Sequence, residues 1–290
     1  MLHIGLMLTK NEGDILGEVI EFNKRYFDKI YVLDDNSNDA SVDILAKYEK
    51  EGLCKVWRSE KIYPGGVNDC CREFLMHQAQ EDYGCEGWFT ILCGDEIYHD
   101  SPLKIALQAE RKKCDFTVWY AMDFFLHTED YGRKWPENTL WQDRIRWYCP
   151  GRLEGRQFKN MPHLYWTKNG KWVKTIGGTA LPNGLKWYKV YPKYGIFKHY
   201  NYRTPEQIRK RAMDRFNSNH RQRNRYKQYI NMPDNEFYIP RTKGMKVARK
   251  FEGSFYEFEL ENQGSMLRRW LNSGKYLPIK FGKLYKQKVD

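Results

Sequence analysis

The stretch WFTILCGDEIYHD, residues 88–100, decides how the rest of the chain is interpreted. Its first six residues, 88–93, form a nearly continuous apolar run, which is typical of a parallel strand buried on both faces. A glycine ends this run and is followed at once by two carboxylates, Asp95 and Glu96. Adjacent carboxylates at the end of a core strand are electrostatically costly unless something positive meets them. The sequence therefore predicts that a cationic group lies at this strand end.

Alternating strand and helix patterns surround this stretch over the first 120 residues. Apolar runs predict strands, and apolar residues at helical spacing between them predict helices. This alternation is typical of an α/β fold whose mostly parallel sheet has helices on both faces, with ligands bound at the carboxyl ends of the strands. The expected strands are 2–8, 29–34, 53–58, 87–93 and 115–121, and the expected helices are 13–27, 39–52, 66–84 and 101–114.

Three of these strand ends carry polar side chains. They are TKNE at 9–12, DDNSND at 34–39 and GDE at 94–96, so we expect a shared polar crevice. Neither the glycine-rich dinucleotide fingerprint nor the P-loop phosphate motif occurs in the sequence. Asp and Asn also favour turns and helix N-caps, so a purely structural role for 34–39 remains an alternative.

The order of these motifs carries a resemblance to a known family. LTKNEGDIL at 8–16, FDKIYVLDDNSNDASVDIL at 27–45 and CGDE at 93–96 resemble the start of a family 2 glycosyltransferase with the Rossmann-like GT-A fold. Such enzymes have a strand ending in Asn-Glu, a strand ending in an Asp-x-Ser-x-Asp turn, and an apolar strand ending in Asp-x-Asp. The resemblance implies a hexosyltransferase-type enzyme that uses a nucleotide-sugar, with UDP- and GDP-sugars as the leading donors.

The resemblance also assigns residues to the donor crevice. In the family, side chains at these strand ends contact the base, the ribose or the diphosphate of the donor. For Arg72, on the helix before strand 87–93, a solvated helix surface is the alternative. The implied donor-binding residues are Thr9, Asn11, Glu12, Asp34, Asp35, Arg72 and Asp95.

A divalent cation, Mn²⁺ or Mg²⁺, is implied as the group that neutralises the leaving diphosphate. By the same resemblance its protein ligands are Asp95, Glu96 and His199. Cys93 departs from the family pattern because it replaces the first Asp of Asp-x-Asp, and a thiol is a poor ligand for these hard cations. The sequence thus leaves open a weakly bound cation, a metal-free enzyme, or a Glu96 that serves only to hold its loop.

His199 ends a short predicted strand in GIFKHYNYRTPEQIRKRA, residues 195–212. Thr204 as N-cap and Pro205 as first residue predict a helix directly after it. In related transferases a His-Tyr pair before such a helix closes the donor site and can ligate the metal. The alternative is a strand-end histidine bonded to a backbone carbonyl.

The segment after residue 121 is dense in aromatic, acidic and basic side chains, which suits a sugar acceptor. An inverting transfer needs a general base that takes the proton of the acceptor hydroxyl. The candidates are Asp130, Asp143 and Glu129, with a retaining mechanism left open. The acceptor class expected here is a glycan, a lipid-linked sugar or a protein.

Charge is distributed unevenly along the chain. Residues 1–100 hold 10 Lys/Arg and 20 Asp/Glu, whereas residues 101–290 hold 39 and 17. The basic helix pattern at 203–227 suits an anionic membrane surface or a solvated helix face. The alternative function is therefore a protein that binds nucleic acid or an anionic surface, but no nucleic-acid-binding signature supports it.

Three regions are expected from these patterns: a nucleotide-sugar-binding half at 1–120, an acceptor-side half of the same domain at 121–202, and a basic helical extension at 203–290. Seven cysteines without a CxxC pair predict reduced thiols. The longest apolar runs are too short for a transmembrane helix or a signal peptide. We expect a cytoplasmic protein with an option of peripheral membrane contact.

Overall fold

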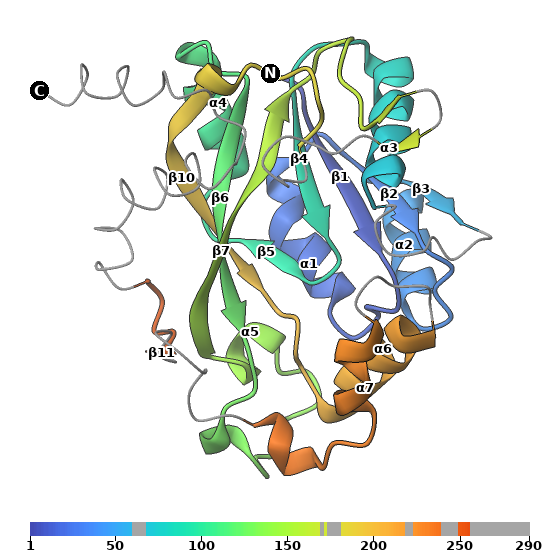
Figure 1. Ribbon diagram of the computed structural model, residues 1–290, viewed down its shortest axis with the longest axis vertical. Coiled ribbons are helices and arrows are strands. Elements are labelled where there is room, and N and C mark those ends of the chain that lie inside the picture. Colours follow the sequence, from blue (N-terminus) through green and yellow to red (C-terminus); the bar gives the residue numbers. More distant parts are fainter. Residues whose placement is uncertain (60–67, 169–170, 173–180, 218–222, 239–248, 256–290) are drawn as a thin grey trace, which may run out of the picture.

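The computed structural model describes residues 1–59, 68–168, 171–172, 181–217, 223–238 and 249–255 (Figure 1). One mixed sheet runs through this part of the chain, with the strand order β3-β2-β1-β4-β7-β6-β10-β5 and with β11 paired to β7. A separate pair is formed by β8 and β9. The strands are β1 (His3–Thr9), β2 (Lys29–Asp34), β3 (Cys54–Arg58), β4 (Trp88–Cys93), β5 (Glu96–Tyr98), β6 (Phe116–Phe124), β7 (Trp147–Lys159), β8 (Thr167–Lys168), β9 (Lys171–Trp172), β10 (Val190–His199) and β11 (Arg249–Lys250).

The sheet is mostly parallel, as the sequence predicts. Strands β3, β2, β1 and β4 are parallel neighbours, and β6 and β10 run in the same direction as these four. Strands β7 and β5 run in the opposite direction. All five strands expected within the first 121 residues are present, so the α/β fold class is confirmed.

Helices cover both faces of the sheet (Figure 1). Helices α1 and α2 pack on one face through residues such as Val19 and Leu45, and α3 packs on the other through Leu75 and Ala79. No helix in the described ranges is long and apolar enough to cross a bilayer. The helices are α1 (Leu16–Asn23), α2 (Ser41–Lys50), α3 (Asn68–Tyr83), α4 (Pro102–Arg111), α5 (Trp141–Arg144), α6 (Pro205–Asn217) and α7 (Arg223–Ile230), with 3₁₀ turns η1 (Lys24–Tyr26), η2 (Thr128–Asp130), η4 (Trp187–Lys189) and η5 (Asp234–Phe237).

The predicted start of α6 is confirmed, and it fixes the direction of the chain after β10. The Oγ1 of Thr204 accepts a hydrogen bond from the backbone N–H of Gln207 at 3.0 Å. This bond satisfies one of the backbone donors that a helix start leaves unpaired. Because the cap follows His199 within five residues, α6 begins beside the carboxyl end of β10.

Strands β5, β7, β8, β9 and β11 were not predicted, and β5 and β7, which bear on the site, were missed for different physical reasons. The three-residue strand β5 (Glu96–Tyr98) is too short to show a periodic pattern, yet it pairs with the end of β10. Strand β7 lies antiparallel between β4 and β6 and carries charged residues that pair with one another inside the protein. Internal charge pairing hides the apolar alternation by which a strand is recognised in sequence.

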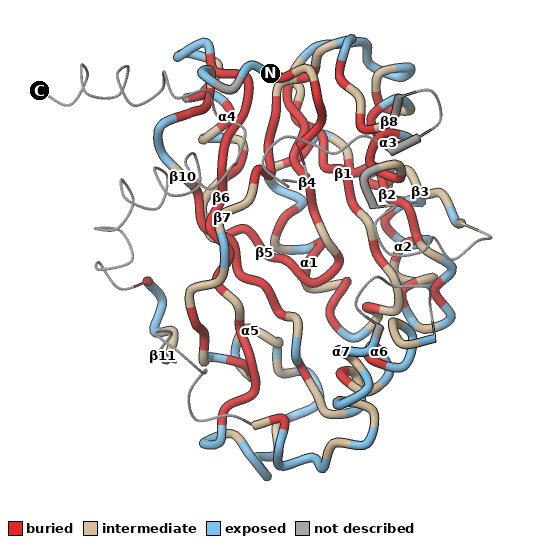
Figure 2. The backbone as a smooth tube through the Cα atoms, viewed as in Figure 1, coloured by how far each residue is buried: buried red, intermediate tan, exposed pale blue. Residues whose placement is uncertain are grey.

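The core consists of separate clusters packed against the sheet, and the central strands are themselves buried (Figure 2). Trp88 and Trp119 are almost completely buried there. On β10, Gly195 lies against the indole ring of Trp119, so a Cβ at this position would collide with the ring. The glycine thus lets β6 and β10 pair closely, which places the end of β10 beside β5.

Candidate active site

The carboxyl ends of β1, β2 and β4 meet at one edge of the sheet. In the parallel register, Thr9 lies opposite Asp34, and Leu8 lies opposite Cys93. The next residue, Gly94, passes so close to β1 that a Cβ there would lie 2.5 Å from the Thr9 Oγ1. Only a glycine fits this approach, and it brings Asp95 and Glu96 to the same edge.

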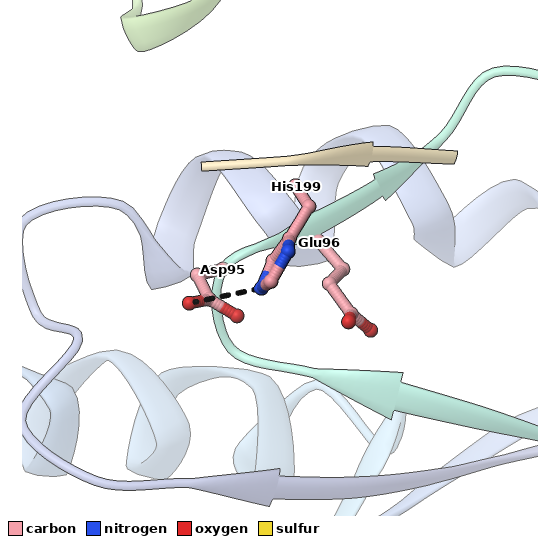
Figure 3. Close-up of side chains that lie close together, drawn as sticks. All are labelled: Asp95, Glu96 and His199. Carbon is pink, nitrogen blue, oxygen red and sulfur yellow. Dashed lines mark ion pairs between the residues drawn. The ribbon is translucent and has the colours of Figure 1, made fainter. Parts of the chain in front are cut away.

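Asp95, Glu96 and His199 converge at this edge (Figure 3). Glu96 and His199 are register partners across β5 and β10, and Asp95 precedes them in the β4–β5 turn. One potential ligand atom from each of the three residues lies within 4.8 Å of the others. The His199 Nε2 is 3.8 Å from the Asp95 Oδ2. The three predicted metal ligands are therefore brought together in space.

A fourth residue, Asp123 at the end of β6, fixes the orientation of His199. Its Oδ1 lies 2.9 Å from the His199 Nδ1, which leaves Nε2 directed at Asp95. Burial lowers the pKa of His199, but Asp95 and Asp123 outweigh burial and raise it above its ordinary value. Sequence reasoning missed Asp123; the only signal was a single carboxylate within the apolar strand FTVWYAMDF.

Glu96 is already engaged by the protein. The guanidinium of Arg156 on β7 donates to both carboxylate oxygens, at 2.9 and 2.6 Å, and the backbone N–H of Cys93 donates to one of them at 3.1 Å. Arg156 also pairs with Glu154. With both oxygens hydrogen-bonded, Glu96 holds the β4–β5 turn, which is the alternative that the sequence left open beside metal binding.

Cys93 lies within the same buried surroundings. Its Sγ is 3.7 Å from an Nη1 of Arg156, and burial raises the pKa of the thiol to about 12. A neutral thiol at the position of the first Asp of the motif is a poor ligand for a hard cation such as Mg²⁺ or Mn²⁺. Arg72 on α3 is buried, not on a solvated helix surface, and its charge acts on Cys93 from nearby.

Asp95 meets a second arginine, Arg211 on α6. An Nη2 of Arg211 donates to the Asp95 Oδ2 at 2.7 Å and to the Glu12 Oε1 at 2.8 Å. Burial alone raises the pKa of Asp95, but Arg211 and His199 hold it well below its ordinary value. Burial raises the pKa of Glu12, although two arginines act against it. Asp95 is thus ionised and paired.

Arg203, just before α6, completes this cluster. Its side chain is fully buried, pairs with Glu12 and donates to the Asp14 Oδ2 at 2.7 Å. The sequence interpretation of 203–227 as a membrane-facing or solvated basic surface is therefore wrong for Arg203 and Arg211, which point inward. Their carboxylate partners are more than 100 residues away in sequence, so no local pattern could reveal them.

The predicted donor-binding residues divide into engaged and available groups. Asp34 is fully buried and accepts hydrogen bonds from Ser37 and Arg58. Asn11 accepts a hydrogen bond from the Asn38 backbone at 2.9 Å, and these contacts shape the turn. The buried Oγ1 of Thr9 and Oδ1 of Asp35, by contrast, form no hydrogen bond within the described part of the chain, while the Oδ2 of Asp35 pairs with Lys10 at 3.1 Å. Unpaired buried polar atoms are costly, so these two point to a ligand.

The three predicted general bases form their hydrogen bonds and ion pairs apart from the Asp95 cluster in the described residues. Asp130 in η2 pairs with Arg133 at 3.8 Å, and burial raises its pKa. Glu129 and Asp143 are exposed. Within the described ranges, the hydrogen bonds and ion pairs of these three residues do not reach Asp95 or His199. Their catalytic role stays a prediction.

An α/β sheet with polar side chains gathered at the carboxyl ends of β1, β2 and β4 is the arrangement typical of the GT-A fold. The family model for glycosyl transferase family 2 matches residues 6–149, from β1 into β7. This match agrees with the resemblance to family 2 glycosyltransferases that the sequence motifs carry.

Similar solved structures include Staphylococcus aureus TarS. The crystal structure of TarS 1–349 shares 15% identity, covers 79% of this chain and 69% of that chain, and has a TM-score of 0.43. TarS 1–349 in complex with UDP shares 16% identity, with coverage of 79% and 70% and a TM-score of 0.44. The complex with UDP-GlcNAc shares 15% identity at the same coverage, with a TM-score of 0.41. No curated protein matches the sequence.

Proposed function

We propose that this protein transfers a hexose from a UDP- or GDP-sugar to a hydroxyl acceptor, with a divalent cation at Asp95. The observation that carries the proposal is the pair of unsatisfied buried atoms, Thr9 Oγ1 and Asp35 Oδ1, at the strand ends beside Asp95. Hydroxyl and carboxylate oxygens suit the N–H and O–H groups of a nucleoside. The crevice thus offers hydrogen bonds that the protein itself leaves unmade.

A cavity supports the same assignment. It has a volume of about 230 Å³ and lies at the ends of β2 and β3, where Leu33, Trp57, Arg58 and Phe74 contribute to its lining. Trp57 and Phe74 present aromatic surface at its wall, and aromatic faces stack on nucleobases. Arg58 of this lining is the register partner of Asp34, which lies opposite Thr9, so a base in the cavity would lie at the same strand ends as the proposed donor-binding residues.

The donor set at Asp95 fits a divalent cation in part. Asp95 supplies carboxylate oxygen, and His199 supplies Nε2 because Asp123 holds its other ring nitrogen, an arrangement common around metal-bound histidines. Glu96 fits less well because Arg156 occupies both of its oxygens. Asp95 and His199 would therefore hold Mn²⁺ or Mg²⁺, which would offset the charge that develops on the leaving diphosphate.

The acceptor and the base are proposed from the sequence together with the placement of the residues. A hydroxyl of a glycan, a lipid-linked sugar or a protein would lose its proton to Asp130, Asp143 or Glu129. Asp130 is the first choice because its pKa is raised, and a carboxylate with a raised pKa is a stronger general base. The outward basic residues of α6 and α7 would serve a peripheral membrane contact if the acceptor is lipid-linked.

A thermal-shift panel with UDP, GDP, CDP and dTDP, each with and without Mn²⁺, tests the proposal. A nucleotide at a hundredfold excess over its Kd should stabilise the protein by about 2.7 kcal/mol. Asp35→Ala should weaken binding of the preferred nucleotide while the fold stays intact, and Asp43→Ala on α2 serves as the control. If no nucleotide stabilises the parent protein, or if Asp35→Ala binds as tightly as the parent, the crevice assignment is wrong.

A further inference from the structure

Arg211 occupies the oxygen of Asp95 that a cation would need. Its Nη2 is 2.7 Å from the Asp95 Oδ2, the same atom that lies 3.8 Å from the His199 Nε2. Its Nη1 donates to the Asn201 backbone oxygen at 2.8 Å and to the Asn201 Oδ1 at 3.1 Å. The guanidinium therefore lies next to Asp95 and His199, the two residues that would best serve as metal ligands.

A guanidinium and a divalent cation cannot share this position at low cost. Both are positive, and buried surroundings screen their repulsion poorly. The cluster without a ligand holds three carboxylates, on Glu12, Asp14 and Asp95, against the charges of Arg203 and Arg211. Adding a divalent cation turns one excess negative charge into one excess positive charge, which an entering diphosphate would offset.

The position of Arg211 allows it to leave. Its side chain is 20% exposed, whereas that of Arg156, bound to Glu96, is 3% exposed. Arg156 donates two parallel hydrogen bonds to one carboxylate, while Arg211 gives Asp95 a single contact. If a cation bound Asp95 and broke its contact with Arg211, Arg211 would keep its hydrogen bonds to Glu12 and Asn201 and so stay at these strand ends.

We propose that Arg211 is the resident counter-ion of Asp95, and that it exchanges this carboxylate for the donor's diphosphate when a divalent cation binds. This inference rests on the proposed function for the identity of the diphosphate. A planar guanidinium suits phosphate oxygens, so the released group has a partner of opposite charge. Arg211 thereby couples cation binding to donor binding, and each is favoured by the presence of the other.

Calorimetric titration of Mn²⁺ alone, and then of UDP and GDP at saturating Mn²⁺, tests the exchange. Arg211→Gln should bind Mn²⁺ alone about tenfold more tightly than the parent because the competing charge is gone. The same variant should bind the nucleotide in the presence of Mn²⁺ about tenfold more weakly because a diphosphate ligand is lost. Opposite signs for the two ligands are the signature of an exchanged residue.

A matched control lies on the same helix. Arg209 donates to the Met232 backbone oxygen and pairs with Asp234, on the side of α6 away from Asp95. Arg209→Gln removes one arginine from α6 but should change neither affinity. Arg211→Lys keeps the charge with fewer donors, so it should show smaller changes of the same sign if Arg211→Gln does not fold.

The outcomes separate this inference from the proposed function. Unchanged or weaker Mn²⁺ binding in both Arg211 variants would overturn the exchange. Tighter Mn²⁺ binding with unchanged nucleotide affinity would also overturn it, since Arg211 would then be a counter-ion only. A parent protein that binds neither UDP nor GDP would defeat the proposed function, while the Mn²⁺ titration would still report whether Arg211 occupies the cation position.

Discussion

Two arginines reach the β4–β5 turn from different parts of the fold, and they bind its two carboxylates differently. Arg156 comes from β7 inside the sheet and binds Glu96 through two parallel hydrogen bonds. Arg211 comes from α6 outside the sheet and divides its donors between Asp95, Glu12 and Asn201. Neighbouring carboxylates in the sequence thus have separate roles, because Glu96 is fixed by the sheet and Asp95 is held by an element at its margin.

The same kind of ion pair thus stabilises the fold at Glu96 and belongs to the candidate site at Asp95. A buried bidentate pair is costly to break, since each partner would be left as an unpaired buried charge. A pair at the edge of a crevice can be replaced by a ligand that brings its own charge. The position of the arginine, more than its chemistry, decides between the two uses.

The largest expected effect concerns the Arg156 pair. Arg156→Met should lower the free energy of unfolding by about 3–5 kcal/mol, because it leaves the buried Glu96 without its ion-pair partner. Arg211→Met should cost clearly less, because that side chain is more exposed and its two carboxylates keep other partners, Arg203 for Glu12 and His199 for Asp95. Urea unfolding of both variants measures the difference. Equal losses would mean that the two networks are not distinguished by burial.

In activity, substitution of Asp95, the partner of Arg211, should have a larger effect than substitution of Glu96, the partner of Arg156. Asp95→Asn should lower turnover of the nucleotide-sugar at least about 100-fold, because it removes the charge beside the leaving diphosphate. Glu96→Gln should lower it less than about tenfold once the variant is shown to be folded, since Glu96 acts through the turn. Asp234→Asn, at an exposed ion pair, is the control. A Glu96 variant as inactive as the Asp95 variant would make Glu96 a ligand.

The acid stability of the protein tests the β7 network. Burial alone raises the pKa of Glu154, but Arg156 and Arg152 outweigh it and lower the pKa to about 2. A depressed carboxylate pKa contributes stability above its unfolded value of about 4.5, and this stability is lost as pH falls toward 2. Between pH 5 and pH 3 the parent should therefore lose about 2 kcal/mol more than Glu154→Gln. Parallel losses in urea unfolding at the two pH values would contradict this.

The smallest expected effect is that of restoring the family residue at Cys93. Cys93→Asp should tighten Mn²⁺ binding by a few-fold only, because Arg156 lies 3.7 Å from this position and would pair with the new carboxylate. Cys93→Ser, which adds no charge, is the matched control. A gain of a hundredfold or more in calorimetric titration would show that Arg156 releases its carboxylates to the metal, and the contrast with Arg211 would fail.

The order of the strands and helices in the first half could be predicted because the signal for each element lies in its own residues and those next to it. Apolar runs such as that of β4 and helix starts such as Thr204 before α6 depend on neighbouring residues alone. Strand β7 could not be predicted, because its charged side chains are satisfied by partners on β5 and within β7 itself. A strand that carries buried charged residues lacks apolar alternation, so its sequence looks like that of an exposed loop.

For the candidate site, the sequence by itself determined which residues gather at the carboxyl ends of the parallel strands. Thr9, Asp35, Asp95 and His199 were all placed at one edge by strand order and by a family resemblance. Only the tertiary structure decided what meets each of them, because Asp123, Arg156 and Arg211 arrive from distant segments. A carboxylate at a strand end is visible in sequence, but its counter-ion is set by packing, since charges pair across space without regard to their separation along the chain.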